Sequence, residues 1–222
     1  MTDEMSDWHE WHRQYAAQDS ALRRRLATVQ AQLKQALPAE LDVPFQIISL
    51  CAGQGLDVIE TLAAYPHAEH VKARLVELDE RNVAAARQMA VETGLSQVEI
   101  VQGDAAQLAA YEGAVPADIV LACGVFGNIS DRDIFHTIDT LPQLCRRGAT
   151  VLWTRHRRTP DMTPAIRAYF VAHGFTEVAF VAPADNLFSV GVNRYEGEPQ
   201  PLQPDAKLFT FIRKRPTSEV NT

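Results

Sequence analysis

The 222-residue chain has few cysteines, no long apolar run and fewer basic than acidic residues. Its three cysteines, Cys51, Cys123 and Cys145, include no C-x-x-C pair, which argues against a disulfide framework or a zinc site and for a reducing compartment. The N-terminus is acidic and lacks the apolar segment of a signal peptide, and no apolar stretch is long enough to span a membrane. These absences predict a cytoplasmic protein with no metal site.

Positive charge is also scarce, since the formal net charge is −7. A protein that binds nucleic acid broadly needs a basic surface to neutralise phosphates, so this balance favours a small-molecule substrate over a nucleic acid. Basic residues gather only at positions 23–25, 146–147 and 155–158. The sequence does not indicate an oligomeric state.

From residue 45 onward, short apolar runs alternate with helical patterns, which predicts a mostly parallel α/β sheet. Strands are expected at 46–51, 72–78, 98–101, 118–122 and 149–154. Helices are expected at 56–65, 80–93 and 163–173, with another from Ser130 or Asp131 to Cys145. Three further strand-like segments, 175–182, 188–195 and 208–213, follow without a helix between them, so two adjoining late strands should run antiparallel.

The chain divides into an N-terminal arm (1–44), one domain (45–215) and a disordered tail (216–222). Apolar residues at three- and four-residue steps predict helix over 6–36, with a second helix starting at Asp19 or Ser20. The arm has two interpretations. It is a lid whose Tyr15 contacts the substrate, or an amphipathic helix that covers a sheet face.

The strand at 46–51 ends in a glycine turn, and the next strand ends in an acid, Glu77. Glycine lets main chain approach a ligand closely, and a carboxylate can accept hydrogen bonds from both hydroxyls of a ribose. The dinucleotide fingerprint G-x-G-x-x-G is incomplete, because its third glycine position is Val58. The pattern therefore indicates a nucleoside site and argues against a nicotinamide oxidoreductase.

Three motifs carry a more specific resemblance. Residues 50–57 (LCAGQGLD) resemble the first motif of class I S-adenosylmethionine-dependent methyltransferases. Residues 76–81 (VELDER) with 84–87 (AAAR) are similar to the second motif, and residues 101–105 (VQGDA) to the third. The resemblance implies a Rossmann-like, mostly parallel seven-stranded sheet with helices on both faces and an antiparallel C-terminal hairpin. It also implies S-adenosyl-L-methionine as the cofactor.

The resemblance assigns the cofactor to these strand ends. Glu77 would bind the ribose, Asp104 the adenine amine, Ala105 the ring through its backbone N–H, and Leu78 would pack on the adenine. The full set of expected cofactor-binding residues is Cys51, Ala52, Gly53, Gly55, Asp57, Glu77, Leu78, Asp104, Ala105 and Cys123. Structural alternatives stay open: Asp57 as a helix cap, Asp104 as a turn residue, and Asp79 as the ribose ligand in place of Glu77.

Acceptor-binding residues are expected where strands four and five end. Phe126 and Asn128 follow strand four, Arg155 and His156 follow strand five, and Tyr15 would come from the arm. His156, a base kept neutral by neighbouring cations, and Asn128 are the catalytic candidates. The alternatives are a packed Phe126, a turn asparagine and a solvated basic loop.

The leading hypothesis is a methyltransferase that acts on a small anionic metabolite. Methyltransferases that act on the amino groups of nucleic-acid bases commonly have an acidic or Asn residue, two prolines and an aromatic residue after strand four. That motif is absent here. A non-catalytic nucleoside-binding protein is the first alternative, and an RNA methyltransferase that uses the arginine clusters is the second.

Overall fold

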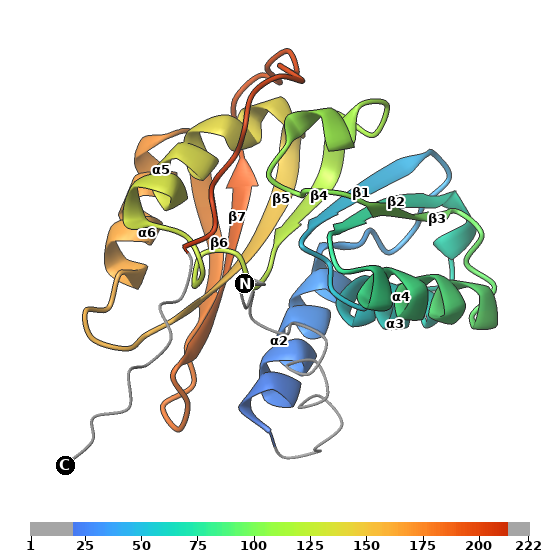
Figure 1. Ribbon diagram of the computed structural model, residues 1–222, viewed down its shortest axis with the longest axis horizontal. Coiled ribbons are helices and arrows are strands. Elements are labelled where there is room, and N and C mark those ends of the chain that lie inside the picture. Colours follow the sequence, from blue (N-terminus) through green and yellow to red (C-terminus); the bar gives the residue numbers. More distant parts are fainter. Residues whose placement is uncertain (1–19, 213–222) are drawn as a thin grey trace, which may run out of the picture.

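A computed structural model describes residues 20–212 of the chain (Figure 1). Its seven strands form one sheet in the order β3-β2-β1-β4-β5-β7-β6. Strands β1 to β5 are parallel, and β7 is antiparallel to both β5 and β6. The strands are β1 (Phe45–Leu50), β2 (Val71–Glu77), β3 (Val98–Gln102), β4 (Ala117–Ala122), β5 (Cys145–His156), β6 (Phe175–Val181) and β7 (Phe188–Tyr195). The mostly parallel seven-stranded sheet and its antiparallel hairpin are confirmed.

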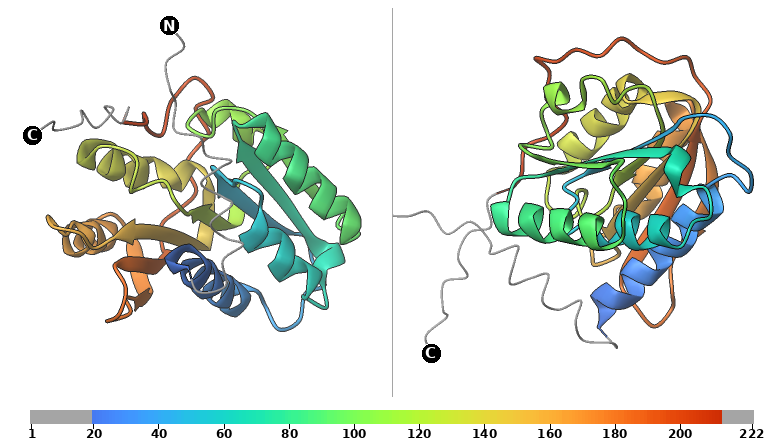
Figure 2. Two further views of the ribbon diagram at one scale, coloured as in Figure 1. Left: turned by 60° about the horizontal axis from the view of Figure 1, so that its bottom comes forward. Right: turned by 90° about the vertical axis from the view of Figure 1, so that its right-hand side faces the viewer.

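Helices cover both faces of the sheet, and each face has its own apolar core (Figure 2). One layer contains α2 (Ala21–Ala36), α3 (Leu56–Ala63) and α4 (Glu80–Glu92), and the other contains α5 (Asp131–Thr140) and α6 (Thr163–Ala172). Short 3-10 turns occupy Ala68–His70, Leu108–Tyr111 and Leu141–Gln143. The buried Tyr111 anchors the loop after β3 on the α5 face, where its hydroxyl donates to Ala105 O at 2.7 Å.

Side-chain caps begin three of the helices, as the sequence predicts. Ser20 accepts a hydrogen bond from Arg23 N at α2, Asp79 from Arg81 N at α4, and Ser130 from Asp133 N at α5. Residues 1–19 lie outside the described part of the chain, and so does the expected role of Tyr15. None of the described helices is long and apolar enough to cross a bilayer.

The helix predicted to run to Cys145 is too long. Helix α5 ends at Thr140, and Pro142 lies in the 3-10 turn that follows. Cys145 instead begins β5, where it pairs with Ala117 across an irregularity in the β4 register. The strand predicted at 149–154 is therefore longer than expected at both ends.

The last predicted strand is also wrong. Residues 208–212 form no sheet strand, and this part of the chain makes only isolated bridges, Gln107 with Lys207 and Ile129 with Phe211. We call residues 202–212, in red in Figure 1, the C-terminal strap. Its Leu208 and Phe209 side chains are buried in the core, and Thr137 on α5 donates to Leu208 O at 3.0 Å. The strap thus packs on loops and a helix instead of a strand.

Candidate functional site

The carboxyl ends of the parallel strands meet at one edge of the sheet, which is where open α/β sheets bind ligands. At the end of β1, a tight turn places Cys51, Gly53 and Gly55 at positive φ values of 51°, 57° and 71°. Cys51 is the one non-glycine residue among positions 20–212 with positive φ. The turn closes through Gly55 N, which donates to Ala52 O at 2.9 Å, and α3 follows directly.

The two glycines of this turn have different roles. A Cβ on Gly55 would lie 2.7 Å from Leu75 Cδ2 and 2.9 Å from Ile59 Cδ1, so the close approach it permits is to the protein's own core. Gly53 faces the strand ends, and its N–H donates to Glu77 Oε2 at 2.8 Å. The main chain of the turn is therefore fixed against the acid at the end of β2.

Glu77 is buried, with 8% of its surface exposed, and its carboxylate is held by main chain. Oε2 accepts from Gly53 N, and Oε1 accepts from Asp79 N at 2.9 Å. Asp79 faces α4 instead, where its carboxylate accepts from Arg81 N and pairs with the Arg81 guanidinium at 2.6 Å. The structure therefore places Glu77, and not Asp79, against the glycine turn.

Asp104 lies just after β3, next to Glu77. Gly103 N donates to Glu77 O at 2.9 Å, which ties the two strand ends together. Asp104 Oδ1 accepts from Ala106 N at 3.0 Å, as in a turn, and Oδ2 pairs with Lys207 Nζ of the strap at 3.2 Å. No sequence signal pointed to Lys207, because the strap reaches this edge only through the tertiary fold.

Three more expected cofactor residues surround this pair. Leu78 is 54% exposed beside Glu77, and Ala105 is buried beside Asp104. Burial raises the pKa of the Cys51 thiol, and the charges of Glu77 and Asp104 raise it further. Cys51 thus lies within the field of both acids as a neutral thiol, consistent with a packing role.

Cys123 and Asp57 lie at the other end of the turn. Gly55 occupies the N-cap of α3, and Asp57 lies inside the first helical turn, where Oδ1 accepts from Val58 N at 2.9 Å. Burial raises the pKa of Asp57 to about 6, although the Val58 N–H and Arg25 on α2 act in the opposite direction. Burial, and then Asp57, raises the pKa of the Cys123 thiol, while Arg25 lowers it.

The loop after β4 uses its predicted acceptor residues for its own structure. Phe126 is fully buried and packs against Trp153 and Phe170, with ring centroids 5.8 and 6.4 Å away. Of its two interpretations, the structure shows the packed one. The Asn128 amide donates to Gly124 O at 2.7 Å and closes the loop, as a turn residue does.

The basic segment at the end of β5 is not a solvated loop. The Arg155 guanidinium donates to Phe126 O and lies 3.9 Å from Asp131 Oδ1, and burial lowers its pKa. Arg157 donates to Pro183 O and Asn186 O, which fixes the loop before β7. Both arginines brace backbone at this edge of the sheet.

His156 is the last residue of β5. Its ring lies beside Gly127, and its buried Nδ1 has no hydrogen-bond partner among the described residues. Burial lowers the pKa of the imidazole, and the charges of Arg155 and Arg158 lower it further. A neutral imidazole therefore lies at the β4–β5 end of the site.

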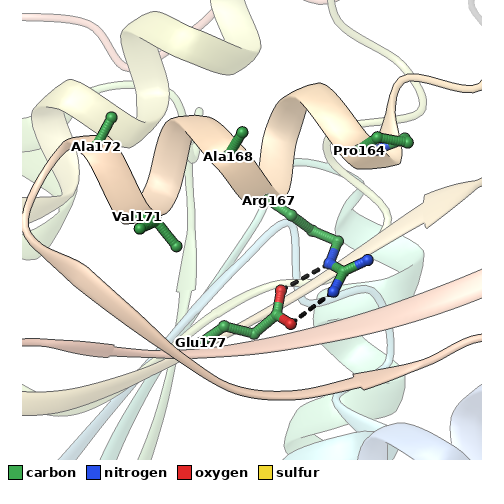
Figure 3. Close-up of a pocket in the computed structure, with 6 residues that line it drawn as sticks. All are labelled: Pro164, Arg167, Ala168, Val171, Ala172 and Glu177. Atoms are coloured by element: carbon green, nitrogen blue, oxygen red, sulfur yellow. Dashed lines mark hydrogen bonds and ion pairs between the residues drawn. The ribbon is translucent and has the colours of Figure 1, made fainter.

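No described group of three or more His, Cys, Asp or Glu residues could hold a metal ion. A shallow groove of about 510 Å³ lies between α6 and β6 (Figure 3). Arg167 and Glu177 form a bidentate ion pair there, with both N–O distances at 2.7 Å. The Arg167 guanidinium also lies over the Phe180 ring, 4.3 Å from its centroid. None of the predicted site residues lines this groove, so the candidate site is the edge that carries the glycine turn.

The topology decides the fold: the parallel strands lie in the order β3-β2-β1-β4-β5, and β7 is inserted antiparallel between β5 and β6. This is the class I methyltransferase fold. Solved structures with it include magnesium protoporphyrin IX methyltransferase from Synechocystis PCC 6803 with bound S-adenosylmethionine, at 16% identity and a TM-score of 0.67. That alignment covers 86% of this chain and 92% of the other.

Two other methyltransferase structures show the same fold. An O-methyltransferase family protein from Burkholderia thailandensis is 17% identical with a TM-score of 0.60, over 79% of this chain and 56% of that longer chain. Precorrin-6y C5,15-methyltransferase from Geobacter metallireducens GS-15 is 15% identical with a TM-score of 0.55, over 77% of this chain and 88% of the other. No family model and no curated protein matches the sequence. The methyltransferase fold is therefore established by structure alone, and the named substrates of these proteins differ.

Proposed function

We propose that this protein is an S-adenosylmethionine-dependent methyltransferase that acts on a small anionic metabolite. The observation that carries the proposal is the Glu77 carboxylate, buried at the end of β2 and held against the glycine turn by two main-chain N–H groups. Each carboxylate oxygen has a second lone pair to accept from a ribose hydroxyl. Asp104 offers a second carboxylate at the neighbouring strand end for the adenine amine, and exposed Leu78 offers an apolar surface for the ring.

The cofactor would supply a methyl group on a positively charged sulfur, which the lone pair of an acceptor displaces. The chain's part is then to hold the acceptor in line and to exclude water. His156 has the properties of a base for an acceptor that must lose a proton, because its lowered pKa leaves the ring neutral and able to take that proton. Arg155 places a fixed positive charge beside it, which favours an anionic acceptor.

The test is calorimetric titration of the full chain with S-adenosylhomocysteine, the demethylated cofactor. We expect saturable binding, and we expect Glu77→Gln to weaken it by about 1.5–3 kcal/mol, the usual contribution of hydrogen bonds to a charged group. Glu80→Gln, an exposed acid three residues on, is the matched control and should bind like the wild type.

Thermal unfolding of both variants would show that they fold. Absence of binding by the wild-type protein would contradict the proposal. Unchanged affinity in Glu77→Gln would transfer the ribose role to another acid. Binding without methyl transfer to any acceptor of a metabolite panel would favour the alternative, a non-catalytic nucleoside-binding protein.

A further inference from the structure

The loop that carries Asp104 is paired with the C-terminal strap. Two backbone hydrogen bonds join them, from Leu208 N to Ala106 O at 2.7 Å and from Leu108 N to Ala206 O at 3.1 Å. Gln107 and Lys207 form an antiparallel bridge in the same stretch. The strap therefore lies against the strand end at which Asp104 is expected to meet the adenine.

Helix α5 also holds the strap at Lys207. His136 on this helix has its Nε2 atom 3.0 Å from Lys207 O, and Thr137 donates to Leu208 O at 3.0 Å. The Leu208 and Phe209 side chains, which follow Lys207 in the chain, are buried in the core. The main chain at Lys207 is therefore fixed by both the loop and α5, and its ammonium reaches Asp104 from a rigid backbone.

The ion pair of Lys207 and Asp104 has hydrogen-bonding capacity to spare. Lys207 Nζ lies 3.2 Å from Asp104 Oδ2, and the two side chains are 43% and 38% exposed, so the pair by itself contributes little to stability. An ammonium has three N–H donors, of which this contact uses one, and each carboxylate oxygen has more than one lone pair. The pair therefore offers a ligand one acceptor and one donor side by side.

We propose that Lys207 is a further cofactor-binding residue, which donates a hydrogen bond to N7 of the adenine while Asp104 accepts from the adjacent amine. Adenine carries a donor and an acceptor next to each other on this edge, the N6 amine and N7. These complement the acceptor on Asp104 and the donor on Lys207. The inference rests on the proposed function, which places the adenine amine at Asp104. The backbone N–H of Ala105 then serves N1, on the other side of the amine.

The fixed backbone bears on the strength of this contact. A lysine loses rotamer freedom when its ammonium is held in one place, and this loss weakens the contacts of most surface lysines. Here the strap already restrains the main chain and Asp104 already restrains the ammonium, so less freedom remains to be lost on binding. Because the pair is partly exposed, we expect the hydrogen bond to N7 to raise the affinity about fivefold or more, near the lower end for a charged donor.

The experiment is calorimetry of the full chain with S-adenosylhomocysteine and with its 7-deaza analogue, in which a C–H group replaces N7. We expect the wild type to bind S-adenosylhomocysteine about fivefold or more tightly than the analogue. Lys207→Met, which removes the donor, should bind the two ligands within about twofold of each other and should match the wild type for the analogue. Lys72→Met, which replaces an exposed lysine near the start of β2, is the matched control and should keep the wild-type preference.

A Lys207→Met variant that keeps the wild-type preference for S-adenosylhomocysteine would overturn the inference, and so would a wild type that binds both ligands equally well. Equal losses of affinity for the two ligands in Lys207→Met would also overturn it, because the lysine would then act only on the shape of the loop. Failure of the proposed function looks different, since the wild-type protein would then bind neither ligand.

Discussion

Gly55 is the residue at which the turn between β1 and α3 tolerates the least change. Its φ of 71° disfavours any side chain, and a Cβ would meet Leu75 and Ile59 at less than 3.0 Å. Gly94 has nearly the same φ, 72°, but open space around the Cβ position. We expect Gly94→Ala to lower the free energy of unfolding by about 1 kcal/mol and Gly55→Ala by about 2–4 kcal/mol. Urea denaturation measures both, and equal costs would show that Leu75 and Ile59 move aside.

The sequence predicted residues whose roles depend on their neighbours in the chain. It missed residues that other parts of the fold bring to the site. Asp79 caps α4 as expected, because a cap depends only on its neighbours in the chain. Glu77 and Asp104 lie at adjacent strand ends because parallel strands bring their carboxyl ends together. Lys207 and Arg25 could not be placed, because they arrive from a strap and a helix whose packing no local pattern specifies.

Among the elements, the C-terminal strap has a predictable energetic contribution. Phe209 is 1% exposed in the core beside α5, whereas Phe211 is 40% exposed. Phe209→Ala should lower the free energy of unfolding by about 3–5 kcal/mol, because it leaves a cavity that the loops around it cannot fill. Phe211→Ala should cost about 1 kcal/mol or less. If urea denaturation gave the two variants the same stability, the strap would not be part of the folded core.

The elements also show what periodicity can and cannot predict. Alternating apolar runs correctly identified all seven strands, and capping residues located the starts of three helices. The same alternation made 208–213 look like a strand, because side-chain periodicity does not reveal whether a sheet edge is available for pairing. In the structure, β6 and β7 complete the sheet, and the described part of this segment packs on α5 and the loops beside it.

For the whole molecule, charge leads to a prediction about nucleic acids. The net charge is −7, and four arginines of the two later basic patches have partners within the protein: Arg146 with Asp118 at 3.0 Å, Arg147 with Glu198 at 2.8 Å, and Arg155 and Arg157 with main-chain carbonyls. We therefore expect no saturable binding of a fluorescent RNA by anisotropy at about 50 mM salt. Binding that weakens steeply as salt is added would contradict this and favour the RNA methyltransferase alternative.

The overall fold was predictable because the alternation of strands and helices extends through most of the chain. The residues expected to bind a methyl acceptor were much less predictable. Aromatic and polar residues after a strand fit a pocket or a packed loop equally well, and in Phe126 and Asn128 the structure shows loop packing. In methyltransferases generally, catalysis depends on alignment more than on a fixed set of catalytic groups, so a sequence alone is a poor guide to an acceptor site.

The strap also has a consequence for biosynthesis. Thr137 on α5 and Leu208, which it contacts, are separated by 71 residues. A chain emerges from the ribosome from its N-terminus, so the apolar surface beneath α5 exists well before Leu208 and Phe209 are available to cover it. During that interval the nascent protein exposes an apolar surface that chaperones can bind. This side of the fold can close only after the strap has been synthesised.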